Sequence, residues 1–77
     1  MRDKAAEKAV SRLVDELIRL RKESGMSHDM LAAAAGVHRS TISLIESKKR
    51  IPTILTCWRI AAALKAQLSS IVKRAED

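Results

Sequence analysis

Three hydroxyl-bearing side chains and one arginine gather in one stretch near the middle of the chain, from Arg39 to Glu46. Arg39 stands at its start, and Ser40 and Ser43 are three residues apart, so a helix would place both serines on one face. A guanidinium can donate two parallel hydrogen bonds to O6 and N7 of a guanine, and a serine hydroxyl can contact base edges or phosphates. These residue types suit the recognition of base pairs in the major groove of DNA.

Leu44 adds an apolar side chain to the same stretch. If Ile42 and Ile45 face the core, Leu44 faces outward, where it could contact a thymine methyl group. It could equally lie at the edge of the core or in a surface for self-association. Arg39 also fits a plain surface charge, or a phosphate contact that distinguishes no bases.

The neighbouring residues predict two short helices joined by a tight turn. Ser27 is a good N-cap for a helix over residues 28–35, because its hydroxyl can accept a hydrogen bond from a first-turn N–H group. Asp29 suits the positive end of the helix dipole. Gly36 allows the positive φ that ends a helix, and a second helix follows over residues 38–46. The predicted inner faces are Leu31, Ala32 and Ala35 on the first helix, and Val37, Ile42 and Ile45 on the second.

The run G-M-S-H-D-M-L-A-A-A-A-G-V-H-R-S-T-I-S-L-I-E-S-K-K-R-I-P, Gly25 to Pro52, resembles the helix-turn-helix regulators of the lambda-repressor/Cro type. This group is also called the xenobiotic-response-element family. Within the run, Ala32 lies four residues before Gly36, and Ile42 lies six residues after it. A weaker resemblance extends outward to residues 20 and 72. The resemblance implies a compact, all-α, five-helix lambda-repressor-like domain that binds double-stranded DNA, with the motif in its second and third helices.

The resemblance also implies contacts to DNA phosphates. His28 stands at the first turn of the second helix, where the family usually has a glutamine bonded to the backbone phosphate. His38 stands where the family often has a serine or threonine N-cap; histidine caps poorly, and whether it faces the DNA instead stays open. The other predicted phosphate contacts are Thr41 and the loop cations Lys48, Lys49 and Arg50.

Two further features of the family bear on the third helix. The family commonly has a glycine where Lys48 stands, so either Lys48 adopts a strained conformation or the helix ends differently. An arginine and a glutamate at the positions of Arg21 and Glu46 form a structural ion pair in the family, which would hold the recognition helix at its angle. The alternative is that both charges are simply solvated.

Three more helices complete the predicted fold. The first covers residues 5–23 and ends at Gly25, and Thr53 can cap a fourth over residues 54–64. A short last helix precedes a polar tail that begins at Lys73. We expect Trp58 in the core and Cys57 as a small buried hydrophobe. The inward faces are predicted as Val10, Leu13, Val14, Leu17 and Leu20; then Ile54, Cys57, Ile60, Ala61 and Leu64; and finally Leu68, Ile71 and Val72.

Length and composition limit the class of protein. A chain of 77 residues fits one domain over 1–77, and we expect a core of about residues 8–72 with frayed ends at 1–4 and 74–77. Its net charge of +6 suits nucleic acid and also an acidic membrane surface. One cysteine and no long apolar run predict a cytoplasmic protein without a membrane segment. No metal site is expected, because the two histidines lack partners at ligand spacing. No cofactor or catalytic group is expected either, because the sequence suggests no nucleophile with a base and no phosphate-binding loop.

The sequence thus favours a DNA-binding transcriptional regulator, either a repressor or a controller protein. The resemblance implies a homodimer on a near-palindromic operator, with Leu64, Leu68, Ile71 and Val72 at the dimer interface, although these residues could instead cover the monomer's own core. An alternative is an antitoxin or phage accessory module whose main partner is another protein, such as a toxin. A degenerate helix-turn-helix that no longer binds DNA also fits.

Overall fold

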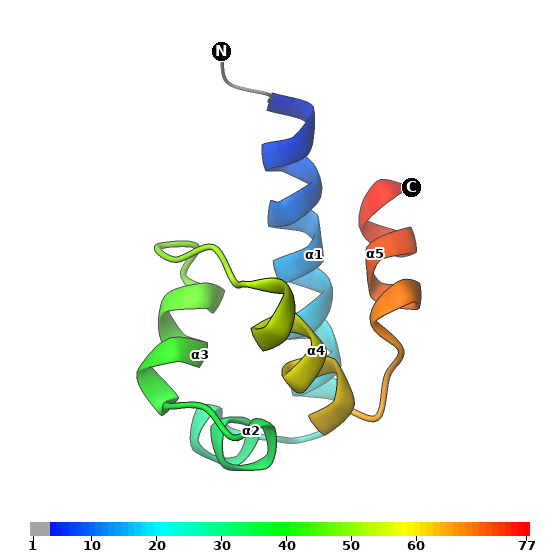
Figure 1. The fold of residues 1–77 in the computed structure, drawn as a ribbon. Helices are drawn as coiled ribbons and strands as arrows, with labels where there is room; N and C mark the ends of the chain where they lie inside the picture. Colours follow the sequence, from blue (N-terminus) through cyan, green and yellow to red (C-terminus); the bar gives the residue numbers. More distant parts are fainter. Residues whose placement is uncertain (1–3) are drawn as a thin grey trace.

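Five helices form the part of the chain that this computed structural model describes, residues 4–77 (Figure 1). They are α1 (Lys4–Glu23), α2 (His28–Ala35), α3 (Arg39–Glu46), α4 (Ile54–Ala63) and α5 (Leu68–Glu76). The predicted all-α architecture is confirmed, and no strand occurs among these residues. The fraying expected at residues 1–3 lies outside the described residues, and Lys4 already begins α1.

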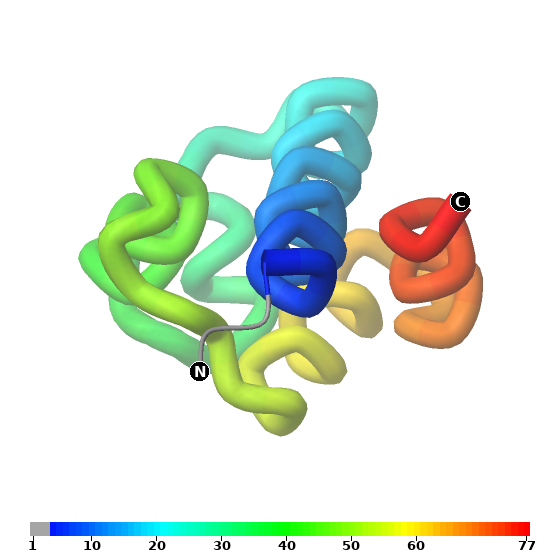
Figure 2. Tube along the Cα trace, turned by 90° about the horizontal axis from the view of Figure 1, so that it is seen from above, coloured from blue at the N-terminus to red at the C-terminus, as the bar shows by residue number. Residues whose placement is uncertain are grey.

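The long α1 separates the two sides of the molecule. It packs most extensively against α5 and also contacts α3, while α2 contacts both α3 and α4. Seen from above, α5 lies beside α1 on one side and α3 lies on the other (Figure 2). The helix predicted to enter DNA is therefore at the edge of the molecule that is remote from α5 (Figures 1 and 2).

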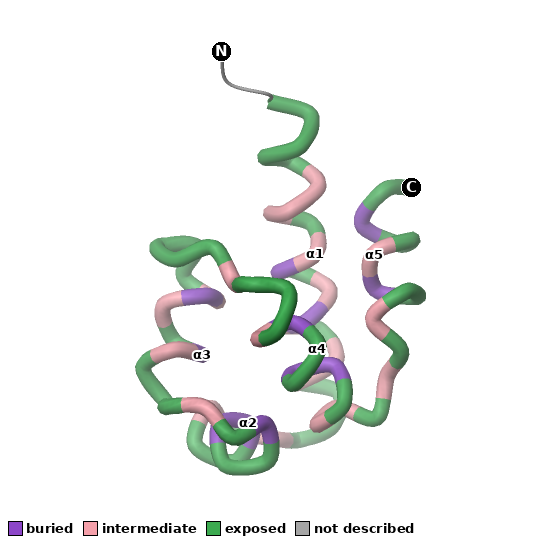
Figure 3. Tube along the Cα trace, viewed as in Figure 1, coloured by how far each residue is buried: buried purple, intermediate pink, exposed green. Residues whose placement is uncertain are grey.

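Aliphatic side chains from all five helices form the core (Figure 3). Leu31, Ile42, Ile45, Ile60 and Ile71 are the largest fully buried side chains. The inner faces of α2 and α3 are occupied as predicted, because Leu31, Ala32, Ala35, Ile42 and Ile45 are all buried. Alanines at the crossing allow close approach of helices, and the isoleucines fill the remaining space.

The C-terminal ends of α2 and α3 share one capping motif, although a glycine takes the left-handed conformation after α2 and a lysine takes it after α3. After α2, Gly36 has φ of 71°, and the N–H of Val37 donates to the carbonyl of Ala32 at 3.0 Å. After α3, Lys48 has φ of 63°, and the N–H of Lys49 donates to the carbonyl of Leu44 at 2.9 Å. These are Schellman-type ends. Of the two predicted alternatives for Lys48, the structure has the strained one, a left-handed conformation that disfavours side chains with a Cβ.

Two predictions for side chains of α4 were wrong. Ile54 and Trp58 were expected to face inward, but they are 73% and 64% exposed. The inward phase of α4 is set by Cys57, Ile60 and Ala61, and Trp58 falls outside it because it is turned by about 100° from Cys57. Ile54 shares the phase of Cys57 and Ala61 but is the first residue of α4 and remains exposed. The first turn of α4 therefore presents apolar side chains to solvent (Figure 3).

The C-terminal helix is longer than the pattern suggested. A polar tail was expected from Lys73, but α5 continues to Glu76, and Ala75 is buried. Ala75 lies four residues after Ile71, so both belong to the same inner face of the helix. The polar residues between them lie on the solvent side of a helix and do not form a tail.

The single cysteine behaves as the predicted small hydrophobe. Cys57 is buried on the inner face of α4 and is a free thiol. Burial raises the pKa of this thiol, which favours the unreactive neutral form. Across residues 4–77, no helix combines the length and the apolar character that crossing a bilayer requires.

Candidate nucleic-acid interface

The third helix is anchored on one face and open on the other. Ile42 and Ile45 are buried in the core, whereas Arg39, Ser40 and Ser43 are exposed. The structure thus brings the three predicted polar base contacts to one outer surface. An inner face fixed by packing and an outer face of short polar groups is the arrangement that a helix in the major groove needs.

Leu44 and Thr41 are less open than the polar residues of α3. Both are half-buried, which brings Leu44 closer to the core-edge interpretation than to a freely exposed methyl contact. Thr41 lines a shallow depression that His38, Arg50 and Arg59 also border. This depression lies where the α2–α3 turn meets the start of α4, and it places cations and N–H donors near one another.

Capping explains how α2 and α3 begin. The hydroxyl of Ser27 accepts a hydrogen bond from the N–H of Met30 at 3.1 Å, as predicted for this N-cap. His38 occupies the N-cap position of α3 with an extended backbone but without a side-chain hydrogen bond to the helix. Its exposed ring therefore does not cap the helix and stays accessible beside the start of α3.

Three helices meet in an ion-pair network at the end of α3. The Nε and Nη2 atoms of Arg21 lie 2.6 Å and 2.9 Å from Oε2 and Oε1 of Glu46. Nη1 of Arg21 donates to the carbonyl of Met26 at 2.8 Å. His28 of α2 lies 3.0 Å from Glu46, measured from Nε2 to Oε1. The structure therefore brings together the pair that the family resemblance implied and adds His28 to it.

Opposing effects act on the Glu46 carboxyl. Partial burial alone raises its pKa, but the hydrogen bonds from Arg21 and then His28 outweigh this effect, so the pKa of Glu46 lies below its ordinary value. A lowered pKa in the folded state means that ionised Glu46 stabilises the fold near neutral pH. This stabilisation is lost as the pH falls below the ordinary carboxyl range and through the lowered pKa.

The three cations after α3, Lys48, Lys49 and Arg50, differ in their contacts. Nζ of Lys48 lies 2.8 Å from Oδ1 of Asp15 and 2.6 Å from Oγ of Ser11, which ties the loop to α1. This contact changes the prediction for Lys48, because its charge is already engaged by a carboxylate. Lys49 and Arg50 are exposed, and within residues 4–77 neither forms an ion pair.

A family model described as helix-turn-helix matches residues 17–71, well over half of the chain. The chain belongs to this helix-turn-helix family, of the xenobiotic-response-element type. The match includes all of α2, α3 and α4. It therefore covers the motif, the loop that follows it and most of the core.

Two curated relatives share the helix-turn-helix region. Both are named antitoxin HigA1, from Mycobacterium tuberculosis strains CDC 1551/Oshkosh and ATCC 25618/H37Rv. Each is 40% identical to this chain over 62 residues, which is 80% of this chain and 42% of the relative. The chain thus spans about two fifths of the length of the curated relatives it matches.

One contact in the helix-turn-helix was missed by sequence reasoning. Asp29, in the first turn of α2, lies 3.2 Å from Arg39 at the start of α3, measured from Oδ1 to Nε. Asp29 had been assigned only a role at the helix dipole. Spacing along the sequence gave no signal for this pair, because the two residues belong to different helices.

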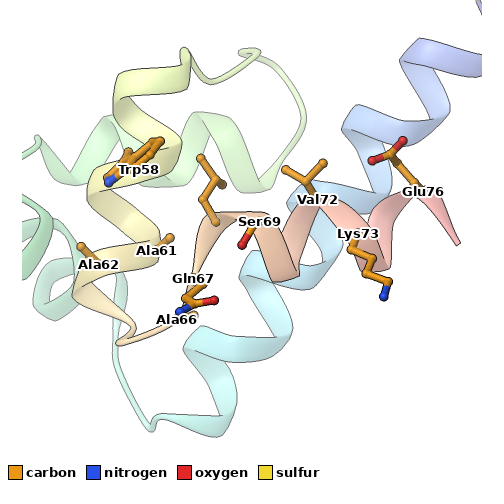
Figure 4. A pocket seen from close by; sticks show the side chains of 10 residues that line it. Trp58, Ala61, Ala62, Ala66, Gln67, Ser69, Val72, Lys73 and Glu76 are labelled. Carbon is orange, nitrogen blue, oxygen red and sulfur yellow. The ribbon is translucent and has the colours of Figure 1, made fainter.

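The opposite side of the helix-turn-helix domain carries an apolar groove of about 750 Å³ between α4 and α5. Trp58 borders it from α4, and Val72 and Glu76 border it from α5 (Figure 4). Ile71 was predicted at a dimer interface but is only 2% exposed, because it faces the core. Leu64, Leu68 and Val72 are half-buried, and the two leucines pack against that core. Trp58 is the more exposed apolar side chain here, at 64%.

No cluster of histidine, cysteine, aspartate and glutamate that could hold a metal ion occurs in residues 4–77. His28 is engaged with Glu46, and His38 stands at the separate N-cap of α3. Each histidine therefore has its own surroundings.

Proposed function

We propose that this chain binds double-stranded DNA in a sequence-specific manner and regulates transcription, as a repressor or controller protein without enzymatic activity. The observation that carries this proposal is the two-faced α3, with Ile42 and Ile45 in the core and Arg39, Ser40 and Ser43 at the surface. Membership of the helix-turn-helix family supports it. In this proposal α3 enters the major groove, and the half-buried Leu44 contacts a thymine methyl group only at its exposed edge.

Phosphate contacts surround the recognition helix in the proposed complex. His28, in the first turn of α2, keeps 32% of its side chain exposed beside its contact with Glu46. His38 occupies the N-cap position at the start of α3, where Thr41 also lies. Lys49 and Arg50 supply cations in the loop that follows the C-terminal end of α3. These groups position the protein on the duplex, and the net charge of +6 adds a general attraction to the DNA.

Selection of bound duplexes from a random pool tests the proposal directly. We expect enrichment of a near-palindromic site whose half-sites are about one helical turn apart. Retarded migration of the selected duplex, but not of a scrambled one, would demonstrate specificity. If no duplex is retarded even in low-salt buffer, the chain is a degenerate helix-turn-helix and the proposal is wrong.

Lys49→Ala should weaken binding in a salt-dependent manner. Each phosphate neutralised by a protein cation contributes about −0.9 to the slope of log K against log salt concentration, so the slope should become shallower by roughly this amount. Affinity measured by fluorescence anisotropy at several salt concentrations gives the slope. Arg74→Ala removes a cation from α5, on the far side of the molecule from α3 (Figure 2), and should leave it unchanged. Equal slopes for wild type and Lys49→Ala would remove Lys49 from the interface.

A homodimer is the proposed binding form, with Trp58 and Val72 at its interface and the buried Ile71 excluded. Trp58 is the only tryptophan and is 64% exposed, and tryptophan is enriched among residues that dominate interface energies. Trp58→Ala should shift the sedimentation of a micromolar solution toward the monomer. Met30→Ala, which removes another exposed apolar side chain from α2, should sediment like wild type. Monomeric wild-type protein at this concentration would contradict the proposal.

A second candidate function is that of an antitoxin, and the identity to two proteins named antitoxin HigA1 favours it. In this case a protein partner would bind the chain in addition to DNA. Co-expression with the product of the neighbouring gene tests the hypothesis. A stable complex that also relieves growth inhibition by that product would support it, whereas a neighbouring product that is harmless and elutes separately would contradict it.

A further inference from the structure

An acidic side chain lies among the residues that we propose for DNA binding. Asp29 is the second residue of α2, and Arg39 is the first residue of α3. Oδ1 of Asp29 lies 3.2 Å from Nε of Arg39, and the two side chains are 74% and 70% exposed. An uncompensated carboxylate at this place would repel the phosphates on either side of a recognition helix. Its pairing with Arg39 offers a reason for its presence.

The ion pair leaves the guanidinium of Arg39 accessible. A guanidinium has five N–H donors, of which one is on Nε and the others are on the two Nη atoms. The closest approach of Asp29 to Arg39 is at Nε, and 70% exposure of the arginine side chain keeps its guanidinium within reach of an external acceptor. A bidentate contact with O6 and N7 of a guanine requires two N–H donors held side by side.

We propose that Asp29 is a positioning residue that orients Arg39 toward a guanine; this inference rests on the proposed function. The carboxylate restricts a long, flexible side chain before DNA arrives, so less conformational entropy is lost on binding. It also competes with phosphates for the guanidinium, which disfavours contacts that distinguish no bases. Asp29 is itself favoured in the first turn of α2 by the helix dipole.

Three variants test this role on duplexes chosen by the unaltered protein. The base pair at which Arg39→Ala no longer distinguishes guanine from adenine identifies the position that Arg39 contacts. A good bidentate contact gives roughly a tenfold or greater preference for guanine, and Asp29→Asn should reduce this preference by about two- to fivefold, the range that an exposed ion pair can supply. Affinity for a non-specific duplex should stay equal or rise, because a negative charge has been removed. In the Arg39→Ala background, Asp29→Asn should change the preference no further.

Glu23→Gln is the matched control, because it removes an exposed carboxylate that pairs with Arg19 in α1. It should leave the guanine preference intact, and thermal melts should show that all variants are folded. An unchanged guanine preference in Asp29→Asn would overturn the positioning role. So would a finding that Asp29→Asn lowers base preference equally in the wild-type and Arg39→Ala backgrounds. If Arg39→Ala keeps every base preference, Arg39 contacts no base and the inference is wrong. If wild type binds no duplex, the proposed function itself has failed.

Discussion

Ser43→Glu should abolish specific DNA binding while leaving the fold intact. Ser43 lies in the exposed middle of α3, and glutamate is at least as good a helix former as serine. In the major groove, however, the new carboxylate would face base edges between two rows of phosphates. Like-charge contacts cost several kcal/mol, so we expect a loss of affinity of roughly a hundredfold or more, since about 1.4 kcal/mol corresponds to tenfold.

A matched substitution separates the position of the charge from the charge itself. Ser70→Glu places the same group in the first turn of α5, on the side of the molecule remote from α3 (Figure 1), where the helix dipole favours an acid. Its affinity for the selected duplex should stay within about threefold of wild type, because only the net charge has changed. Equal affinities for Ser43→Glu and wild type would show that α3 lies outside the groove.

The framework of this fold was accessible to sequence reasoning because it depends on local rules. Capping by Ser27 and by Thr53 follows from hydroxyl chemistry within one turn of helix, and both hydroxyls accept the expected N–H groups at 3.1 Å and 3.0 Å. The inward phase of α3 follows from the spacing of Ile42 and Ile45. For the same reason, the residues on the outer face of α3 could be predicted from the sequence.

The error at Trp58 arose because residue type was allowed to outweigh helical phase. As the only aromatic residue, Trp58 was assigned to the core, although Cys57, Ile60 and Ala61 already define the inner face of α4. A core built from aliphatic side chains leaves little room for an indole, and the groove between α4 and α5 accommodates it at the surface instead.

Ion pairs between distant segments were the least predictable part of the site. Asp15 and Arg19 stand four residues apart with the acid first, the better spacing for an ion pair within one helix, but Asp15 contacts Lys48 while Arg19 contacts Glu16 and Glu23. An exposed charge has several candidate partners of similar energy, and the choice depends on how the helices cross. The same is true of His28, whose contact with Glu46 spans two helices. Only the family resemblance, not spacing, indicated the pair between Arg21 and Glu46.

This pair leads to the largest expected effect on stability. Glu46→Ala leaves the guanidinium of Arg21, which is 12% exposed, without its carboxylate partner. Removing one member of a buried pair costs about 3–5 kcal/mol, and the lower value suits a site that retains some solvent. Because about 1 kcal/mol shifts the Tm of a domain of this size by roughly 4–8 °C, the Tm should fall by roughly 10 °C or more. Glu23→Ala, which breaks an exposed pair with Arg19, should change the Tm little.

The acid dependence of stability provides an independent test of the same group. Since the pKa of Glu46 is lowered in the folded state, its contribution is present at neutral pH and disappears as the pH falls through that lowered pKa. Glu46→Gln cannot titrate, so the stability difference between wild type and this variant should shrink as the solution is acidified. Other carboxyl groups titrate equally in both proteins and cancel in the comparison. A Tm of Glu46→Ala within a degree of wild type, or a difference that does not depend on pH, would mean that Arg21, His28 and Glu46 do not hold α3 in place.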